Sequence, residues 1–234
     1  MHLIGIIPAR GGSKGIPKKN IIPCAGKPLL AYTAAAALAA RGLSRVILST
    51  DDRDIVQLGE TLGLDIPYLR PPELADDDTP IVDVLQNIMD WMGEYNEPCD
   101  GVVLLQPTSP LRRAEHIDSA IALYESHIPT TVVSVTPVPH QFTPSSLMCQ
   151  TDEGLRPWVK GEQVLRRQDK PTLWARNGPA VLITHPETIR SGTLYSDRVL
   201  GYEMDARSSL DVDSLEDLAR VEWELTINNT LQDE

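Results

Sequence analysis

Basic residues and glycines alternate in one short segment near the start of the chain, residues 7–20, which reads IPARGGSKGIPKKN. Glycines let a backbone approach a ligand closely, and the cations among them, Arg10, Lys14 and Lys19, are donors for phosphate oxygens. Neither the Walker A pattern nor GxGxxG fits the segment. Because a triphosphate needs several positive charges at short range, this spacing favours a polyphosphate site over an ordinary solvated loop.

A second candidate segment, residues 104–112, reads LLQPTSPLR. An apolar run is followed there by two prolines, so the loop after it is expected to be rigid. Gln106, Thr108 and Ser109 offer hydrogen-bonding groups, and Arg112 adds a further charge. Taken alone, the segment is as typical of a structural turn as of a binding loop.

Two carboxylates, Asp211 and Asp213, stand two positions apart in the segment SLDVD, residues 209–213. On an extended backbone, side chains at this spacing point to the same side. Such a pair suits Mg²⁺, which takes one or two carboxylates and completes its shell with phosphate oxygens and water. Asp213 has an alternative role, because with Glu216 three residues later it fits a helix N-cap and its capping box. Asp211 is therefore the preferred metal ligand, and Asp213 fits either role.

Two further segments combine turn residues with polar groups: RPPELADDDTP at 70–80 and QDKPTLWARNG at 168–178. Neither indicates a function by itself. The acidic run 76–78 is more typical of a solvated approach to a helix than of a metal site.

The elements that position these segments follow from short apolar runs alternating with amphipathic stretches, a pattern typical of an α/β sheet. Strands are expected at residues 3–9, 45–50, 64–69, 102–106, 131–136 and 180–184, and helices at 28–41, 52–62, 80–92, 114–126 and 214–227. The rhythm breaks at 137–176, which is expected to leave the sheet as a subdomain that covers substrate or contacts a second subunit. We therefore predict one α/β domain over residues 1–234 with this insertion. In such sheets ligands bind at the carboxyl ends of the strands, where the first two candidate segments lie.

Charge is distributed unevenly along the 234 residues, whose 21 Lys and Arg and 33 Asp and Glu give a formal net charge of −12. The first 50 residues hold seven basic side chains and no acidic one. The overall acidity argues against nucleic acid and anionic membranes as partners. A cationic first fifth in an acidic chain indicates a local anion site.

Three cysteines, Cys24, Cys99 and Cys149, lie far apart and form no CxxC pair. The first residues lack the features of a secretory signal, and no apolar run approaches the roughly 20 residues of a membrane span. These observations predict a soluble cytoplasmic protein with reduced thiols.

Six segments, taken together and in order, resemble a known family. They are IPARGGSKGIPKKN (7–20), STD (49–51), RPPELA (70–75), LQPTSPLR (105–112), Asn177-Gly178 and LDVD (210–213). The family is the N-acylneuraminate cytidylyltransferases, or CMP-sialic acid synthetases, and the match covers about residues 3–220. One motif could arise by chance, whereas six in the same order are specific.

The resemblance implies a Rossmann-like, three-layer nucleotidyltransferase sheet with a small inserted dimerisation or substrate subdomain, and a homodimer. It also implies Mg²⁺-dependent transfer of CMP from CTP to the anomeric hydroxyl of a nine-carbon 2-keto acid sugar, with release of pyrophosphate, for surface glycan biosynthesis. Such a reaction consists largely of positioning and charge neutralisation, and the chain offers no Ser-His-Asp or Cys-His set for a covalent route.

By position, the resemblance assigns roles to individual residues. The triphosphate would be held by Arg10, Gly12, Ser13, Lys14 and Lys19, and the rest of the nucleotide would meet Asn20, Arg70 and Thr79. The sugar would contact Gln106, Arg167 and Asn177, and the metal would bind Asp211 and Asp213. Catalysis would depend on Lys19, Arg10 and Asp211.

Departures from the family pattern concern the sugar half. Residues 174–182 read WARNGPAVL, where the Arg is shifted by one position and the family's strand Tyr is absent. The segment PVPHQFTP at 137–144 lacks the family's Lys, for which His140 and Arg176 are candidate substitutes. The acceptor is therefore expected to be sialic acid or a relative such as legionaminic or pseudaminic acid.

Two alternatives remain open. An eight-carbon (Kdo) cytidylyltransferase is similar in its first loop but typically lacks the SKGxPxKN form. A non-catalytic nucleotide sensor would use the same loop, but it would not need Asp211 and Asp213 beside an intact set of lysines.

Overall fold

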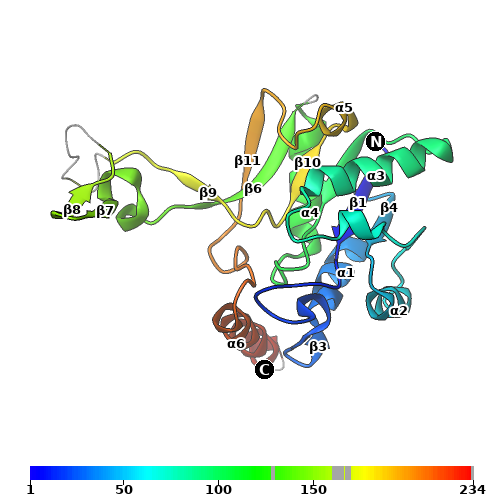
Figure 1. Cartoon of the computed structure of the whole chain (residues 1–234), viewed down its shortest axis with the longest axis horizontal. Coiled ribbons are helices and arrows are strands. Elements are labelled where there is room, and N and C mark those ends of the chain that lie inside the picture. Colours follow the sequence, from blue (N-terminus) through cyan, green and yellow to red (C-terminus); the bar gives the residue numbers. More distant parts are fainter. Residues whose placement is uncertain (128–129, 160–165, 167–169, 233–234) are drawn as a thin grey trace.

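A mixed, mostly parallel sheet forms the centre of the molecule (Figure 1). The computed structural model describes residues 1–127, 130–159, 166 and 170–232. Within these residues the sheet has seven strands in the order β11-β6-β10-β5-β1-β4, with β9 added beside β6. The strands are β1 (Leu3–Pro8), β4 (Arg45–Ser49), β5 (Gly101–Leu104), β6 (Thr131–Pro137), β9 (Trp174–Arg176), β10 (Leu182–Thr184) and β11 (Val199–Glu203). Strand β1 pairs in parallel with β4 and β5, and β10 runs antiparallel between β5 and β6.

Alternation along the strands supplies a core on each face of the sheet. Leu3 and Ile7 of β1 pack into one apolar cluster, while Ile4 and Ile6 pack into the other. The first face is covered by α1 (Leu29–Ala39), α2 (Arg53–Thr61) and α4 (Ala114–Glu125), and the second by α3 (Ile81–Glu94) and α5 (Pro186–Arg190). Both faces of the expected α/β sheet are thus buried.

Several expected elements are confirmed, and four differ. The strand expected at 64–69 is wrong: Asp65 forms only an isolated bridge with Ile47, and Pro67, two residues later, has no N–H to extend a ladder. Strand β11 and helix α5 were not predicted, because neither carries a long periodic apolar pattern. The C-terminal helix α6 (Leu215–Gln232) runs further than expected.

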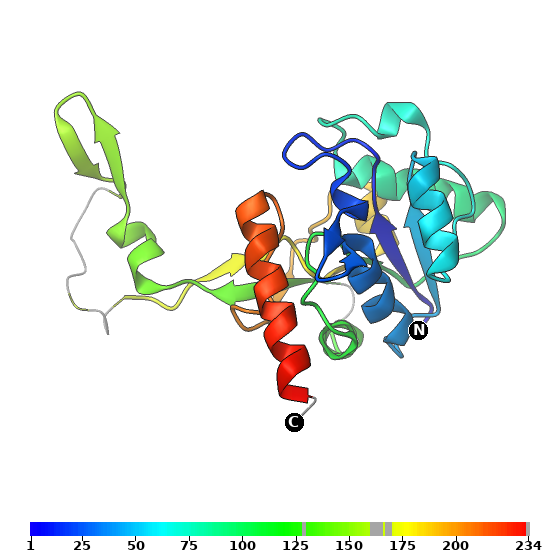
Figure 2. The same cartoon turned by 90° about the horizontal axis from the view of Figure 1, so that it is seen from below.

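Between β6 and β9, the described residues 138–159 and 170–173 leave the sheet as an extended arm, where the insertion was expected (Figures 1 and 2). After β6 come two short helical turns, η3 (His140–Phe142) and η4 (Pro144–Ser146), and a hairpin of β7 (Met148–Thr151) and β8 (Gly154–Pro157). The chain then returns through β9, which pairs antiparallel with β6. The described part of the arm exposes large apolar side chains, among them Phe142, Leu155 and Trp158.

Smaller elements lie in the segments between β1 and α1 and between α2 and α3: η1 (Lys19–Ile21), the short pair β2 (Pro23–Cys24) and β3 (Lys27–Pro28), and η2 (Pro72–Leu74). The three cysteines form no disulfide. Among the helices that the structure describes, none combines the length and apolar character needed to cross a membrane.

Candidate active site

A cavity of about 260 Å³ opens at the carboxyl ends of the parallel strands β1 and β5. The chain reaches it from loops that follow β1, β4 and β5, because parallel strands end at the same edge of a sheet. Eight of the predicted residues line it: Arg10, Gly12, Ser13, Lys19, Asn20, Arg70, Thr79 and Gln106. Sequence segments up to 96 positions apart thus meet at one place.

The loop after β1 is held in shape by hydrogen bonds to its backbone. Asp51 Oδ1 accepts from Gly11 N at 3.0 Å, and Asn20 Nδ2 donates to the carbonyl of Arg10 at 2.9 Å. A Cβ at Gly11 would lie 2.5 Å from Asp52 Oδ2, so this position requires glycine. The amide N–H of Asn20 therefore binds the loop, although Asn20 also lines the cavity. Asp51, just after β4, had no predicted role and holds the loop through Gly11.

Arg10 and Lys14 converge on one carboxylate. Asp77 Oδ1 pairs with the guanidinium of Arg10, and Asp77 Oδ2 lies 3.0 Å from Lys14 Nζ. The hydrogen bond from Lys14, together with Arg10, lowers the pKa of Asp77. Lys14 lines a shallow depression next to the main cavity rather than the cavity itself. The acidic run 76–78, interpreted above as a solvated approach to a helix, thus supplies a direct partner for two predicted phosphate ligands.

Two arginines of the predicted loops are buried and bind main-chain oxygens. Arg70 donates to the side chain and carbonyl of Ser49 and to the carbonyl of Leu74. Arg112, 2% exposed, donates to the carbonyls of Gln106 at 3.1 Å and Ala180 at 2.7 Å. Burial lowers the pKa of both guanidinium groups. Arg70 lines the cavity, whereas the charge expected from Arg112 at a ligand is instead used inside the fold.

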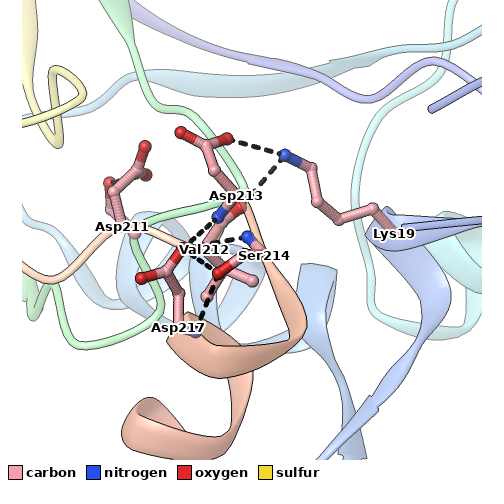
Figure 3. Close-up of polar contacts among 7 residues, drawn as sticks. Lys19, Asp211, Val212, Asp213, Ser214 and Asp217 are labelled. Atoms are coloured by element: carbon pink, nitrogen blue, oxygen red, sulfur yellow. Dashed lines mark hydrogen bonds and ion pairs between the residues drawn. The ribbon is translucent and has the colours of Figure 1, made fainter. Parts of the chain in front are cut away.

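The acidic segment before α6 lies against the lysine of the first loop (Figure 3). Lys19 Nζ donates to the carbonyl of Val212 at 3.0 Å and to Asp213 Oδ1 at 3.1 Å. The carboxylates of Asp211 and Asp213 point to the same side, as their spacing predicts. Asp211 Oδ1 accepts from Ser109 Oγ at 3.3 Å, and burial raises the pKa of Asp211.

The helix cap differs from the alternative considered for Asp213. Ser214 Oγ accepts from the backbone N–H of Asp217 at 3.2 Å, and Asp217 Oδ2 accepts from Ser214 N at 2.9 Å. Ser214 and Asp217 thus form the capping box that sequence reasoning gave to Asp213 and Glu216, one position too early. The side chain of Asp213, 77% exposed, is free of that role and faces Lys19.

The donor set near Asp211 fits a hard divalent cation. Two carboxylates lie on one side of the segment, and the Ser109 hydroxyl binds one of them. Gly178 leaves room, because a Cβ there would lie 3.2 Å from Asp211 Oδ1. Among the described residues no group of three His, Cys, Asp or Glu side chains could hold a metal unaided. A cation held by these two carboxylates would have to complete its shell with phosphate oxygens and water.

The residues predicted for the sugar are dispersed. Gln106 lines the cavity, but Asn177 is 5% exposed and bound to Ser134 and Ser209. Arg167 lies outside the described residues. Arg176 does not line the main cavity, and its guanidinium donates to Tyr195 Oη at 2.6 Å. His140 lies in the arm, at the start of η3.

Comparison with known proteins gives consistent results. A family model described as cytidylyltransferase matches residues 4–218. The chain is 36% identical to an N-acylneuraminate cytidylyltransferase of Streptococcus agalactiae over 94% of its own length, and it spans about half the length of that relative. It is 31% identical to a CMP-N,N'-diacetyllegionaminic acid synthase of Legionella pneumophila, over 97% of this chain and 95% of that protein.

A solved structure also shares the fold. A CMP:2-keto-3-deoxy-manno-octonic acid synthetase complexed with CTP superposes with a TM-score of 0.73, covering 97% of this chain and 100% of that one, at 16% identity. At this identity the likeness concerns the mixed α/β fold, with its mostly parallel sheet and small extra sheets.

Proposed function

Since this chain belongs to the cytidylyltransferase family, we propose that it transfers CMP from CTP to the anomeric hydroxyl of a nine-carbon 2-keto acid sugar. The anomeric hydroxyl gives its proton to a carboxylate while its oxygen attacks the α-phosphorus, the bond from that phosphorus to the β-phosphate oxygen breaks, and pyrophosphate leaves. The observation that carries the proposal is the contact of Lys19 with the acidic segment 211–213 beside the main cavity. This contact brings cations for phosphates next to carboxylates for a metal.

Different residues around the cavity are proposed to bind the nucleotide and the sugar. Arg10, Gly12, Ser13, Lys14 and Lys19 are proposed to hold the triphosphate, with Asn20, Arg70 and Thr79 toward the rest of the nucleotide. Gln106, at the end of the loop after β5, is proposed to meet the sugar. Catalysis then consists of placing the two reactants in line and neutralising the charge that develops on the leaving pyrophosphate.

Asp211 and Asp213 are proposed to hold Mg²⁺. When bound, this ion neutralises phosphate charge and orients the phosphate oxygens. Lys19 keeps the segment against the first loop through the Val212 carbonyl, so the carboxylates stay beside the phosphate site. Ser109 orients Asp211 by donating to its Oδ1.

For the acceptor we propose sialic acid or, preferably, a relative of the legionaminic type. The Legionella protein is named for the synthesis of CMP-N,N'-diacetyllegionaminic acid. Its match to this chain extends over nearly the full length of both proteins. The altered run at 174–182 and the missing Lys at 137–144 support a changed sugar pocket. The eight-carbon alternative is less favoured, because this chain has the SKGxPxKN form in its first loop and its likeness to the eight-carbon synthetase structure is one of fold at 16% identity.

The arm supports a homodimer as the working form. It extends away from the sheet, and Leu155 and Trp158 are 63% and 66% exposed. Apolar side chains on an extended hairpin gain burial only from another surface. A second copy of the chain is the proposed partner, and residues 137–176 the proposed contact.

Pyrophosphate release from CTP, measured with a panel of keto-acid sugars, tests the proposal. Release is expected with nine-carbon acids, with the highest kcat/KM for a diacetylated legionaminic-type sugar, and little with the eight-carbon acid. Heat-denatured protein and reactions with ATP in place of CTP serve as controls. If the chain bound CTP measurably but released pyrophosphate with none of the sugars, the result would favour the nucleotide sensor and contradict the proposed enzyme.

A further inference from the structure

Asn177, assigned by resemblance to the sugar, is enclosed by the scaffold of the site. Its Nδ2 donates to Ser209 Oγ at 2.8 Å, and its Oδ1 accepts from Ser134 Oγ at 2.6 Å. Only 5% of the residue is exposed. Both ends of the amide are therefore engaged by the hydroxyl groups of Ser134 on β6 and of Ser209 before the acidic segment, which leaves the amide poorly placed to bind a ligand.

The network is anchored in the central sheet. Ser134 is fully buried on β6, and its hydroxyl also accepts from Val181 N at 2.9 Å. Asn177 connects this rigid point to Ser209, two residues before Asp211. A buried amide that joins two hydroxyls restricts the positions of all three groups, because hydrogen bonds inside the fold are costly to break.

Gly178, the next residue in the chain, lies against Asp211, the proposed metal ligand. Its φ of +112° is a conformation that L side chains rarely adopt, and a Cβ would lie 3.2 Å from Asp211 Oδ1 and 3.3 Å from Ser109 Oγ. The carboxylate of Asp211 thus lies close against the backbone of this dipeptide. Asn177 holds the start of the segment while Gly178 provides the space that the carboxylate occupies.

We propose that Asn177 and Gly178 are positioning residues that set the place of the Asp211 carboxylate, and that Ser134 anchors them to the sheet. This inference rests on the proposed function, in which Asp211 holds the metal. It replaces a direct contact of Asn177 with the sugar. Groups that orient a metal ligand from behind commonly change metal affinity by roughly 10- to 100-fold when they are removed.

Direct metal binding separates this role from a sugar contact. Mn²⁺ is used as the probe and is titrated into the full chain in the presence of CTP, with free Mn²⁺ followed by electron paramagnetic resonance. Asn177→Ala is expected to weaken Mn²⁺ binding about 10-fold, and Ser209→Ala and Ser134→Ala to weaken it in the same direction. At saturating metal, the KM for the sugar is expected to stay within about two-fold of the wild-type value, since no contact to the sugar is removed.

Matched variants control for general loss of stability. Ser209→Thr keeps the hydroxyl and is expected to retain wild-type Mn²⁺ binding. Ser208→Ala removes a hydroxyl from the neighbouring buried residue, outside the Asn177 network, and is expected to leave Mn²⁺ binding unchanged. If Asn177→Ala does not fold, Ser209→Ala carries the test, because Ser209 is only partly buried.

The outcomes are distinguishable. A raised KM for the sugar with unchanged Mn²⁺ affinity in Asn177→Ala would overturn the inference and restore the sugar contact. Unchanged Mn²⁺ affinity in folded Ser134→Ala and Ser209→Ala would overturn it as well. Absence of Mn²⁺ binding by the wild-type chain with CTP would instead count against the proposed function itself.

Discussion

Lys19 Nζ lies 3.1 Å from Asp213 Oδ1, although 194 positions separate the two residues in the sequence. The lysine belongs to η1 at the end of the first loop, and the aspartate precedes the last helix (Figure 3). The same ammonium group donates to the Val212 carbonyl, so Lys19 binds both the backbone and a carboxylate of the acidic segment. The phosphate side and the metal side of the proposed site are therefore directly connected.

Removal of that ammonium group is expected to be severe. Lys19→Ala should lower kcat/KM by roughly 100-fold or more, because it removes a cation from the transferring phosphates and detaches the acidic segment. Initial rates of pyrophosphate release measure this. The neighbouring Lys18 pairs with Asp54 at 2.7 Å on the surface, so Lys18→Ala is the matched control. Near-normal turnover by Lys19→Ala would remove Lys19 from the site.

Asp211→Asn is expected to keep the fold and to weaken Mg²⁺ binding. Burial raises the pKa of Asp211, so the ionised carboxylate is unfavourable in the fold and an amide is tolerated there. Activity should fall by about 100-fold, and the Mg²⁺ concentration for half-maximal rate should rise. Glu216→Gln changes one exposed charge in the same region as a control. An unchanged Mg²⁺ titration would contradict the assignment of Asp211.

Asp77 and a triphosphate would compete for the same two cations. Asp77→Asn removes the partner of Arg10 and Lys14, so the KM for CTP is expected to fall about two- to five-fold, and the difference should shrink as KCl is raised. Asp78→Asn makes the same charge change one residue away as a control. A higher KM for CTP in Asp77→Asn would show that Asp77 orients the cations for the nucleotide.

Acid is expected to destabilise the fold through His116. Burial and the nearby guanidinium of Arg113 lower the pKa of this imidazole below its usual 6.5, and its Nδ1 accepts from Arg113 N at 3.2 Å. Below about pH 6.5 the unfolded chain therefore binds a proton that the folded chain resists, and stability is lost as pH falls. The drop in Tm between about pH 7.5 and 5.5 should be smaller in His116→Gln, which keeps an acceptor but does not titrate. Equal drops would exclude His116 as the cause.

The arm is expected to control assembly. Wild-type protein should sediment as a dimer, and a double variant of Leu155→Glu and Trp158→Ala should sediment as a monomer with an unchanged Tm, because Leu155 on β8 and Trp158 directly after it are both exposed outside the core. Trp223, 62% exposed on α6, provides Trp223→Ala as a control of similar exposure. A double variant that remains dimeric would place the contact elsewhere.

Local chemistry explains which features could be predicted from sequence. The loops after β1 and β5 were predictable, because glycines, prolines and cations there directly follow apolar runs. Arg112 was not, because its carbonyl partner on Ala180 is 68 positions away and nothing nearby in the sequence indicates burial. The roles of Asp51 and Asp77 likewise depend on distant partners, Gly11 and Arg10.

The error at α6 has a different cause. Asp213 and Ser214 are both good N-cap residues, and each has an acidic residue three positions later, so the sequence pattern cannot choose between them. Tertiary contact decides: Lys19 engages Asp213, and Ser214 begins the helix. Strand β11 was missed for a related reason, because an edge strand with alternating half-exposed residues carries a weak apolar signal.

The two chain segments at the base of the arm pair with each other, so the length of the arm can vary without moving the central sheet. Pro137 and Trp174 are register partners in the ladder of β6 and β9, so the chain leaves and re-enters the sheet at neighbouring points. Insertions, deletions or whole exchanges between these two residues are expected to leave the strand register of the central sheet unchanged. If the arm carries the proposed subunit contact, exchanging this one module would change assembly without changing the central sheet, and the same two positions are natural junctions for an engineered chimera.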